Sequence, residues 1–283
     1  MTTELNIAFV GGGNMAAALI AGLAGKLTLG GNIHVIDPHA PALEKLQAQF
    51  GVTTATAAGE ALRAVDVIVL AVKPQSMREV AAQLLPFLDG DRAPLVLSIA
   101  AGIRAQDLSR WLGDYRAIVR CMPNTPALIG MGITGMVASS GVSEEQKKTA
   151  DAILRAVGQT VWLDDEAKID PVTAVSGSGP AYVFYFIEAM QQAAAELGLT
   201  PEQGTQLAIA TFTGAAQLAA NSSEPVSLLR ERVTSKGGTT YAALTSMEES
   251  GVRAAIVKGI KAAAARGREL GEELGKQEHL TKP

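Results

Sequence analysis

A glycine-rich segment near the N-terminus could hold a phosphate. Gly11-Gly12-Gly13-Asn14-Met15-Ala16, called the glycine loop below, has the spacing G-x-G-x-x-A. It follows the apolar run Leu5–Val10 and opens a helical pattern that extends to Leu23. Glycines there allow a tight turn and a close backbone approach to a pyrophosphate, and the helix start offers free N–H groups. We predict a dinucleotide site, with an ordinary glycine-rich connection as the alternative.

Asp37 could select the form of the dinucleotide. It ends a second apolar run, Ile33–Ile36, where a carboxylate bonds the ribose 2′-hydroxyl of NADH and repels the 2′-phosphate of NADPH. The position just beyond, where an NADP site usually has an arginine, is Pro38-His39. Residue chemistry alone therefore favours NADH.

Two further segments follow apolar runs that are typical of buried strands. Ala71-Val72-Lys73-Pro74 ends the run that begins at Val65, and Met122-Pro123-Asn124 follows a strand expected over Arg116–Arg120. Ligands of open α/β sheets bind outside the carboxyl ends of the strands, so the first segment should face the cofactor. The second is a stiff loop with two prolines, and rigid polar loops in that location often position a ligand. The alternatives are an ordinary solvated lysine at Lys73 and a structural turn at the second segment.

A segment rich in hydroxyl groups lies in the second half of the chain. Thr234-Ser235-Lys236-Gly237-Gly238-Thr239-Thr240, called the hydroxyl loop below, comes before a helix expected from Tyr241. Hydroxyls and backbone N–H groups at a helix start can hold a carboxylate without a fixed cation. The alternative is a helix cap with a flexible turn before it.

The elements that must position these segments change in type along the chain. Up to about Asp165, strand-like runs such as Leu95–Ile99 and Gly135–Ala138 alternate with helical patterns, as expected for a doubly wound α/β sheet. Beyond it nearly every segment favours helix, for example Ala181–Leu197 and Val252–Gly275. We predict an α/β domain over residues 1–165 and an all-α domain over residues 166–283.

Composition and missing motifs exclude several functions. A formal net charge of −4 in 283 residues does not favour a nucleic-acid partner. No apolar stretch reaches the ~18 residues of a membrane span, and the N-terminus does not resemble a secretory signal. The histidines are scattered, so we expect no metal site, and Cys121, the single cysteine, has no histidine near it in sequence. We expect a soluble, cytoplasmic protein.

The motifs together resemble those of the pyrroline-5-carboxylate reductases. The glycine loop, Ala71–Gln75, Met122–Pro126, Ser176–Tyr182 and Val233–Thr240 occur in the family's order. The match extends from Ile7 to about Gly271, nearly the whole chain. The resemblance implies a Rossmann-like N-terminal domain, a C-terminal dimerisation domain, and reduction of 1-pyrroline-5-carboxylate to L-proline. It also implies a homodimer or a higher oligomer of dimers, with the active site where two subunits meet.

Residue roles follow from the same resemblance. The cofactor, NADPH with NADH also accepted, would bind Gly11–Ala16, Asp37, Ala71–Pro74 and Asn124. Thr240 would place its hydroxyl near the ring nitrogen of the substrate and act in catalysis. The remaining substrate-binding positions would be Val233, Ser235, Gly237, Gly238, Thr239 and Glu224. Most members have proline where this chain has Lys236.

Two other functions compete with this one. A β-hydroxyacid dehydrogenase would need a lysine four residues after the second glycine of Ser176–Gly179, and that position is Val183. A non-catalytic dinucleotide-binding protein would have no need of the intact hydroxyl loop.

Overall fold

The computed structural model describes residues 5–88 and 93–276, and its contacts divide the chain into two compact units. The first, called the α/β unit, extends to Ser178 and takes in the end of the chain from Ala263. The second, called the helical unit, is Gly179–Ala262. The domain boundary expected near residue 165 therefore falls inside the first compact unit.

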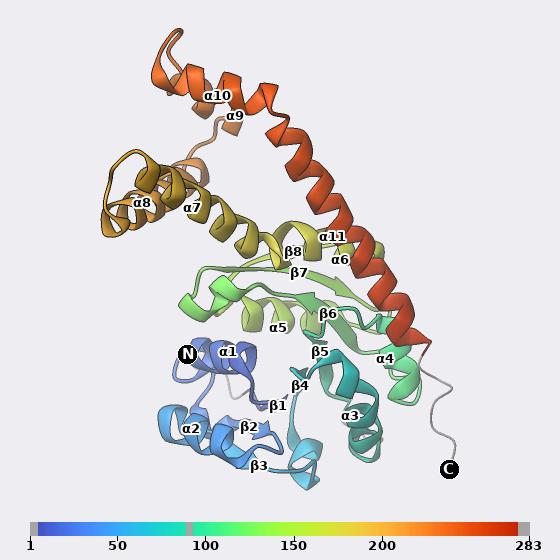
Figure 1. Ribbon diagram of the computed structural model, residues 1–283. Coiled ribbons are helices and arrows are strands. Elements are labelled where there is room, and N and C mark those ends of the chain that lie inside the picture. The colour runs from blue at the N-terminus through green and yellow to red at the C-terminus, as the bar shows by residue number, and fades with distance from the viewer. Residues whose placement is uncertain (1–4, 89–92, 277–283) are drawn as a thin grey trace. The chain divides into compact units, whose positions relative to one another are not determined.

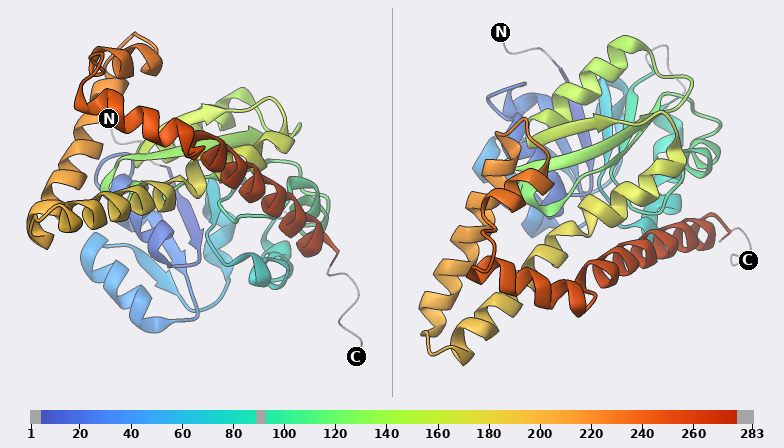
Figure 2. Two further views of the ribbon diagram at one scale, coloured as in Figure 1. Left: turned by 45° about the horizontal axis from the view of Figure 1, so that its top comes forward. Right: turned by 90° about the horizontal axis from the view of Figure 1, so that it is seen from above.

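The α/β unit is built on a single eight-stranded sheet of order β3-β2-β1-β4-β5-β6-β7-β8 (Figure 1). Neighbouring strands are parallel except for β6 and β7, which are antiparallel. The two views of Figure 2 show these strands side by side, in colours from blue to yellow-green. The strands are β1 (Ile7–Val10), β2 (Ile33–Ile36), β3 (Thr53–Ala55), β4 (Val67–Leu70), β5 (Leu95–Ser98), β6 (Ile118–Met122), β7 (Gly132–Ala138) and β8 (Gly158–Trp162).

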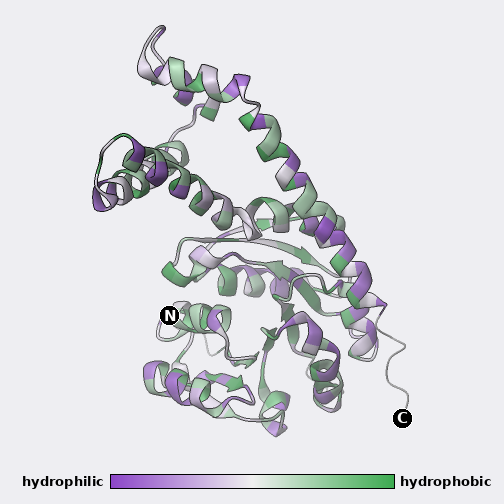
Figure 3. Ribbon diagram, in the orientation of Figure 1, coloured by the Kyte–Doolittle hydropathy of each residue, from purple (hydrophilic) through white to green (hydrophobic). Residues whose placement is uncertain are grey.

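Helices bury both faces of the sheet, which is why the central strands β1, β4 and β5 are buried throughout and, apart from Ser98, apolar. Their hydrophobic character is visible as green in Figure 3. One face packs against α1, α2 and α5, and the other against α3 and α4. These helices are α1 (Asn14–Leu23), α2 (Ala40–Phe50), α3 (Met77–Leu84), α4 (Ala105–Trp111) and α5 (Glu144–Arg155).

The sequence prediction lacks α5, β3 and β8. The α5 helix has a local signal that was available: Ser143 Oγ accepts the N–H of Gln146, and the Gln146 side chain accepts the N–H of Ser143. This is a capping box of the S-x-x-Q type. Both β3 and β8 are edge strands with exposed residues, so they lack the apolar run that marks a buried strand.

The segment after β8 joins the sheet to the helical unit. It contains a short helix, α6 (Ile169–Val172), and one π-helical turn, η7 (Thr173–Gly177). A β-carbon on Gly135 of β7 would lie 2.6 Å from Val172, so only glycine lets α6 pack this closely. Before α6, Glu166 Oε1 accepts hydrogen bonds from the N–H of Ala105 at 2.7 Å and from buried Arg120 at 2.9 Å, which anchors this segment to α4 and β6.

The helical unit contains helices alone, as the sequence predicts. They are α7 (Gly179–Glu196), α8 (Pro201–Ala220), α9 (Val226–Arg232), α10 (Thr239–Glu249) and the first part of α11 (Val252–Gly275). The rings of Phe186 and Phe212 pack with centroids 6.3 Å apart, which joins α7 to α8. Within the described ranges, none of the helices combines the length and apolar character that a bilayer crossing requires.

The last turns of α11 belong to the α/β unit. A β-carbon on Gly271 would lie 3.4 Å from the Gly102 carbonyl oxygen, and Arg104 forms an ion pair with Glu272 at 3.9 Å. Leu274 packs against the core on the α3 and α4 face. The last turns of α11 therefore pack against the fold that surrounds the sheet.

Candidate active site

The glycine loop is held where β1, β2 and β4 end. Gly11 has φ +101°, and a β-carbon there would lie 2.6 Å from the Ala71 carbonyl oxygen. Its N–H donates to the carbonyl of Ile36 at 2.7 Å. A side chain at this position would have to adopt a strained backbone conformation and displace β4, so glycine is required.

The start of α1 is open to a ligand. Gly13 is the N-cap, no side chain caps the helix, and a β-carbon on Gly13 would meet nothing within 4 Å. The first N–H groups of a helix have no partner within it, and they favour an anion. Asn14 and Met15 form the first turn, and buried Ala16 lets the helix pack closely against the sheet.

Both carboxylate oxygens of Asp37 accept backbone N–H groups. Gly12 donates to Oδ2 at 2.7 Å and His39 donates to Oδ1 at 2.8 Å. Asp37 is thus fixed beside the glycine loop, as a residue that reads the ribose must be.

A cavity of about 1000 Å³ extends from the glycine loop along the ends of β2, β3 and β4. Of the predicted cofactor residues, it is lined by Gly11, Gly13, Asp37, Ala71, Val72 and Lys73. The sequence interpretation missed other lining residues, among them Thr56, Ala57, Ser76, Glu79, Gln83 and Phe87. Thr56 directly follows β3, so recognition of that strand would have placed it here.

A smaller cavity of about 280 Å³ shares Ala71 and Val72 with the larger one. Its other lining residues are Met15, Ile99, Met122, Pro123, Asn124, Thr125 and Gly177. It therefore lies at the carboxyl ends of β4, β5 and β6, next to the start of α1. Pro74, which begins a 3-10 turn after β4, lines neither cavity.

The hydroxyl loop forms the start of α10 in the helical unit. The Gly238 N–H donates to the Ser235 carbonyl at 3.0 Å, and Gly237 has φ +75°. The α10 helix begins at Thr239, two residues before the expected start, and no side chain caps it. Its first N–H groups, from Thr239 and Thr240 onward, thus resemble the anion-binding start of α1.

Two further predicted substrate residues lie at the ends of α9. Val233 is the C-cap of α9 and is 63% exposed. Glu224, two residues before the helix, forms an ion pair with Arg232, so α9 places its carboxylate next to the residue that precedes Val233. The structure therefore brings the predicted substrate residues together within one unit.

Cys121 does not offer a reactive thiol. Cys121 is buried in β6, and burial raises the pKa of its thiol, so it stays protonated and unreactive. In the part of the chain that the structure describes, no three His, Cys, Asp or Glu side chains gather as metal ligands.

Comparison with known proteins identifies the family. A family model described as pyrroline-5-carboxylate reductase dimerisation matches residues 166–270, and one described as NADP oxidoreductase, coenzyme F420-dependent, matches residues 6–102. The pyrroline-5-carboxylate reductase of Pseudomonas aeruginosa is 46% identical over 269 residues, which cover 95% of this chain and 98% of that protein. This chain belongs to the pyrroline-5-carboxylate reductase family.

Solved structures of pyrroline-5-carboxylate reductases have the same fold. The enzyme from Coxiella burnetii superposes with a TM-score of 0.89 at 39% identity, covering 95% of this chain and 99% of that one. The Plasmodium falciparum enzyme, solved with NADP bound, gives 0.82 at 29% identity and covers 94% and 98%. The family and the two-part fold predicted from the motifs are confirmed. The dimerisation model starts at residue 166, close to the expected boundary, and it supports an oligomer.

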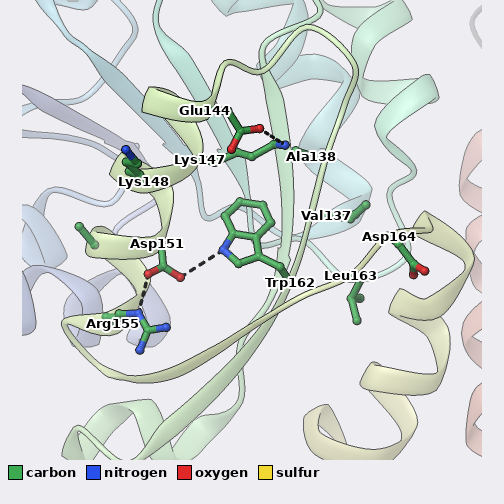
Figure 4. Close-up of a pocket in the computed structure, with 11 residues that line it drawn as sticks. Val137, Ala138, Glu144, Lys147, Lys148, Asp151, Arg155, Trp162, Leu163 and Asp164 are labelled. Carbon is green, nitrogen blue, oxygen red and sulfur yellow. Dashed lines mark hydrogen bonds and ion pairs between the residues drawn. The ribbon is translucent and has the colours of Figure 1, made fainter.

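A third concavity, of about 760 Å³, holds none of the residues predicted for a pyrroline-5-carboxylate reductase (Figure 4). It lies between α5 and the edge strand β8, and several of its charged groups pair with one another. Asp151 accepts from the Trp162 indole N–H at 3.2 Å and from Arg155 Nε at 2.5 Å, and Lys147 donates to Glu144 at 2.6 Å. Burial acts to raise the pKa of Asp151, but hydrogen bonds from Thr160 and Arg155 hold this pKa below its usual value. Four of the charged side chains that line this concavity therefore have a partner within it.

Proposed function

We propose that this chain reduces 1-pyrroline-5-carboxylate to L-proline with NADPH as hydride donor, and that NADH is also accepted. The observation that carries the substrate assignment is the uncapped start of α10, where N–H groups and hydroxyls offer donors to a carboxylate. Family membership supplies the reaction, because relatives that match over nearly their full length have this name.

The residues of the α/β unit fit a dinucleotide. A β-carbon at Gly11 would overlap the Ala71 carbonyl, and the space at Gly13 is open, so the loop leaves room for a pyrophosphate against α1. We assign Gly11–Ala16 to the pyrophosphate and Asp37 to the adenosine ribose. Ala71–Lys73 would border the cofactor at the end of β4, with Lys73 facing its phosphates. The smaller cavity would take the nicotinamide ring.

The reduction needs little acid–base chemistry from the protein. Bound NADPH supplies a hydride to the C=N carbon, which is already electrophilic when the imine is protonated. Positioning is therefore the main task of the chain's residues. Ser235 and the N–H groups of Gly237, Gly238 and Thr239 would hold the carboxylate, and Val233 would pack beside the ring. Thr240 would bond the ring nitrogen as it becomes an amine. Glu224 faces the same loop through its ion pair with Arg232.

We propose a homodimer, or an oligomer of dimers, formed through the helical unit. That unit leaves large apolar side chains exposed, including Tyr185 at 72% and Leu218 at 61%. Exposed apolar surface of this kind marks an association surface. Sedimentation of the purified protein tests the assembly, and a monomer at assay concentration would contradict it. A cytoplasmic location stays a prediction for cell fractionation.

An assay of proline formation tests the function. Purified protein is given 1-pyrroline-5-carboxylate with NADPH and, separately, with NADH, and both proline and the oxidised cofactor are measured. We expect turnover with each cofactor and more with NADPH. A protein that binds NADPH but forms no proline with either cofactor would be the non-catalytic alternative.

A further inference from the structure

Pro180 cannot donate the α-helical hydrogen bond to one backbone carbonyl, that of Ser176. In an α-helix the carbonyl of residue i accepts the N–H of residue i+4, and for Ser176 that residue is Pro180, which has no N–H. Ser176 belongs to the π-helical turn η7, which directly precedes α7. A carbonyl in such a partly buried position needs a donor from elsewhere.

Asn124 supplies that donor. Its Nδ2 donates to the Ser176 carbonyl at 3.2 Å, while its Oδ1 accepts the N–H of Ile133 in β7 at 3.0 Å. Asn124 is 9% exposed and sits in the loop after β6. One carboxamide thus connects three elements: the loop, β7 and the π-helical turn.

The π-helical turn forms part of the smaller cavity. Gly177, the residue after Ser176, lines it together with Met122 and Asn124. A β-carbon on Gly177 would lie 2.7 Å from Met122 Cε, so the turn packs directly against the Met122 side chain at the end of β6. A small shift of the turn therefore changes the shape of this cavity. Single π-helical turns occur frequently at functional sites.

We propose that Asn124 is a positioning residue, which holds the π-helical turn in place as a wall for the nicotinamide ring and does not bind the cofactor itself. This role rests on the proposed function, because the smaller cavity must be the nicotinamide site. It differs from the cofactor-binding role that the sequence suggests, because both ends of the carboxamide bond the protein itself.

Asn124→Asp tests the proposal with almost no change in shape. Aspartate keeps an oxygen for the Ile133 N–H but puts a second oxygen against the Ser176 carbonyl, so the turn should move. We expect kcat to fall about tenfold, since misplacement of reacting groups slows hydride transfer. The Kd for NADPH, measured by cofactor fluorescence, should change by less than about twofold. The isotope effect with NADPH deuterated at the transferred hydrogen should rise.

Asn32→Asp is the matched control. The Asn32 amide donates to Thr28 Oγ1 at 3.4 Å, and this residue lies at the amino end of β2, whereas Asn124 follows the carboxyl end of β6. The control should keep the parent kcat and isotope effect. If Asn124→Asp instead weakens NADPH binding about tenfold with kcat unchanged, Asn124 contacts the cofactor and the proposal is wrong.

A double mutant isolates the hydrogen bond from general damage. In Asn124→Ala the Ser176 carbonyl loses its donor, and adding Pro180→Ala supplies a backbone N–H at the helical i+4 position. We expect Asn124→Ala to lose about tenfold in kcat and the double mutant to recover most of it, a coupling that contacting sites show. Equal kcat in the single and double mutants would overturn the proposal. Failure of the proposed function can be distinguished from failure of this proposal, because in the first case the parent protein itself would form no proline.

Discussion

The glycine loop and the hydroxyl loop both end in a helix start without a side-chain cap, yet the protein supports them very differently. In the glycine loop, the Gly11 N–H donates to the carbonyl of Ile36 in β2, and the Gly12 N–H donates to the Asp37 carboxylate just after β2. The backbone at Gly11 lies so close to the Ala71 carbonyl that a β-carbon would overlap it. The hydroxyl loop is bonded to α9 through its first residue, Thr234, whose N–H and hydroxyl donate to the Glu231 and Arg230 carbonyls. Its own turn is closed by the hydrogen bond from Gly238 to Ser235, and its neighbour Val233 is exposed. The residues proposed for the dinucleotide therefore lie within one unit. The loop proposed for the substrate has uncapped N–H groups at the start of α10, which we expect the substrate carboxylate to bind.

Gly11→Ala should lower activity the most, because it changes the loop that is more tightly packed against its neighbours. The added carbon meets a backbone oxygen at 2.6 Å and fixes a residue with φ +101°. Backbone strain of this kind costs about 1–3 kcal/mol, and displacement of the loop should lower kcat/KM for NADPH by at least about 100-fold. Steady-state kinetics measure kcat/KM, and cofactor fluorescence measures the affinity for NADPH.

Gly25→Ala is the matched control for that change. Gly25 also has positive φ, +74°, but a β-carbon there meets nothing within 4 Å. The Gly25→Ala variant should therefore have the same kind of backbone strain but bind NADPH as tightly as the parent protein. Equal loss of NADPH affinity in the two variants would mean that strain alone, and not the contact with Ala71, disables the site.

Thr240→Ala tests the hydroxyl loop. Loss of the hydroxyl should lower kcat/KM for 1-pyrroline-5-carboxylate by about 10–100-fold, or ~1.4–2.7 kcal/mol of transition-state stabilisation. NADPH binding should not change, because Thr240 lies in the helical unit and the cofactor cavity is lined by the α/β unit. Thr240→Ser keeps the hydroxyl and should retain most activity. An unchanged kcat/KM in Thr240→Ala would remove this residue from the mechanism.

Local patterns predicted the glycine loop because every determinant lies in one short segment. The strand before it, the helix after it and the spacing of Gly11 and Gly13 are all visible in the sequence. The same holds for the hydroxyl loop, where only the start of α10 was two residues off. Asp37 also lies where the pattern predicts, directly after β2 and hydrogen-bonded to the glycine loop, while its role toward the cofactor stays a prediction.

Features that depend on distant contacts could not be predicted in this way. The sequence does not show that the end of α11 packs near Gly102, because the two segments lie far apart along the chain. Nor does it show that the Asn124 side chain reaches Ser176, which lies 52 residues further along the chain. The edge strand β8 lacks an apolar run and is defined by its pairing with β7.

Asp37→Asn should sharpen the comparison at the adenosine end of the cofactor. It removes the charge that opposes a 2′-phosphate while leaving one oxygen for a backbone N–H. We expect the ratio of kcat/KM for NADPH to that for NADH to rise about tenfold, or ~1.4 kcal/mol, and the gain to shrink at high salt. Glu145→Gln, an exposed acid on α5 outside both cavities, should leave the ratio unchanged. A constant ratio in Asp37→Asn would show that Asp37 does not set the cofactor preference.

Lys236→Pro should have the smallest effect and tests how far the hydroxyl loop can be made rigid. Ser235 to Gly238 form a turn closed by the Gly238 N–H, with Gly237 at φ +75° in the third position. This is the pattern of a type II turn, which favours proline in the second position, where Lys236 stands. In the described part of the chain the Lys236 N–H has no hydrogen-bond partner, so proline removes no bond.

Thermal unfolding at fixed protein concentration should show about 0.4–1 kcal/mol of added stability. The KM for 1-pyrroline-5-carboxylate should change less than about twofold. A tenfold rise in KM that high salt abolishes would instead mean that the Lys236 ammonium attracts the carboxylate, and that this loop binds its substrate partly by charge.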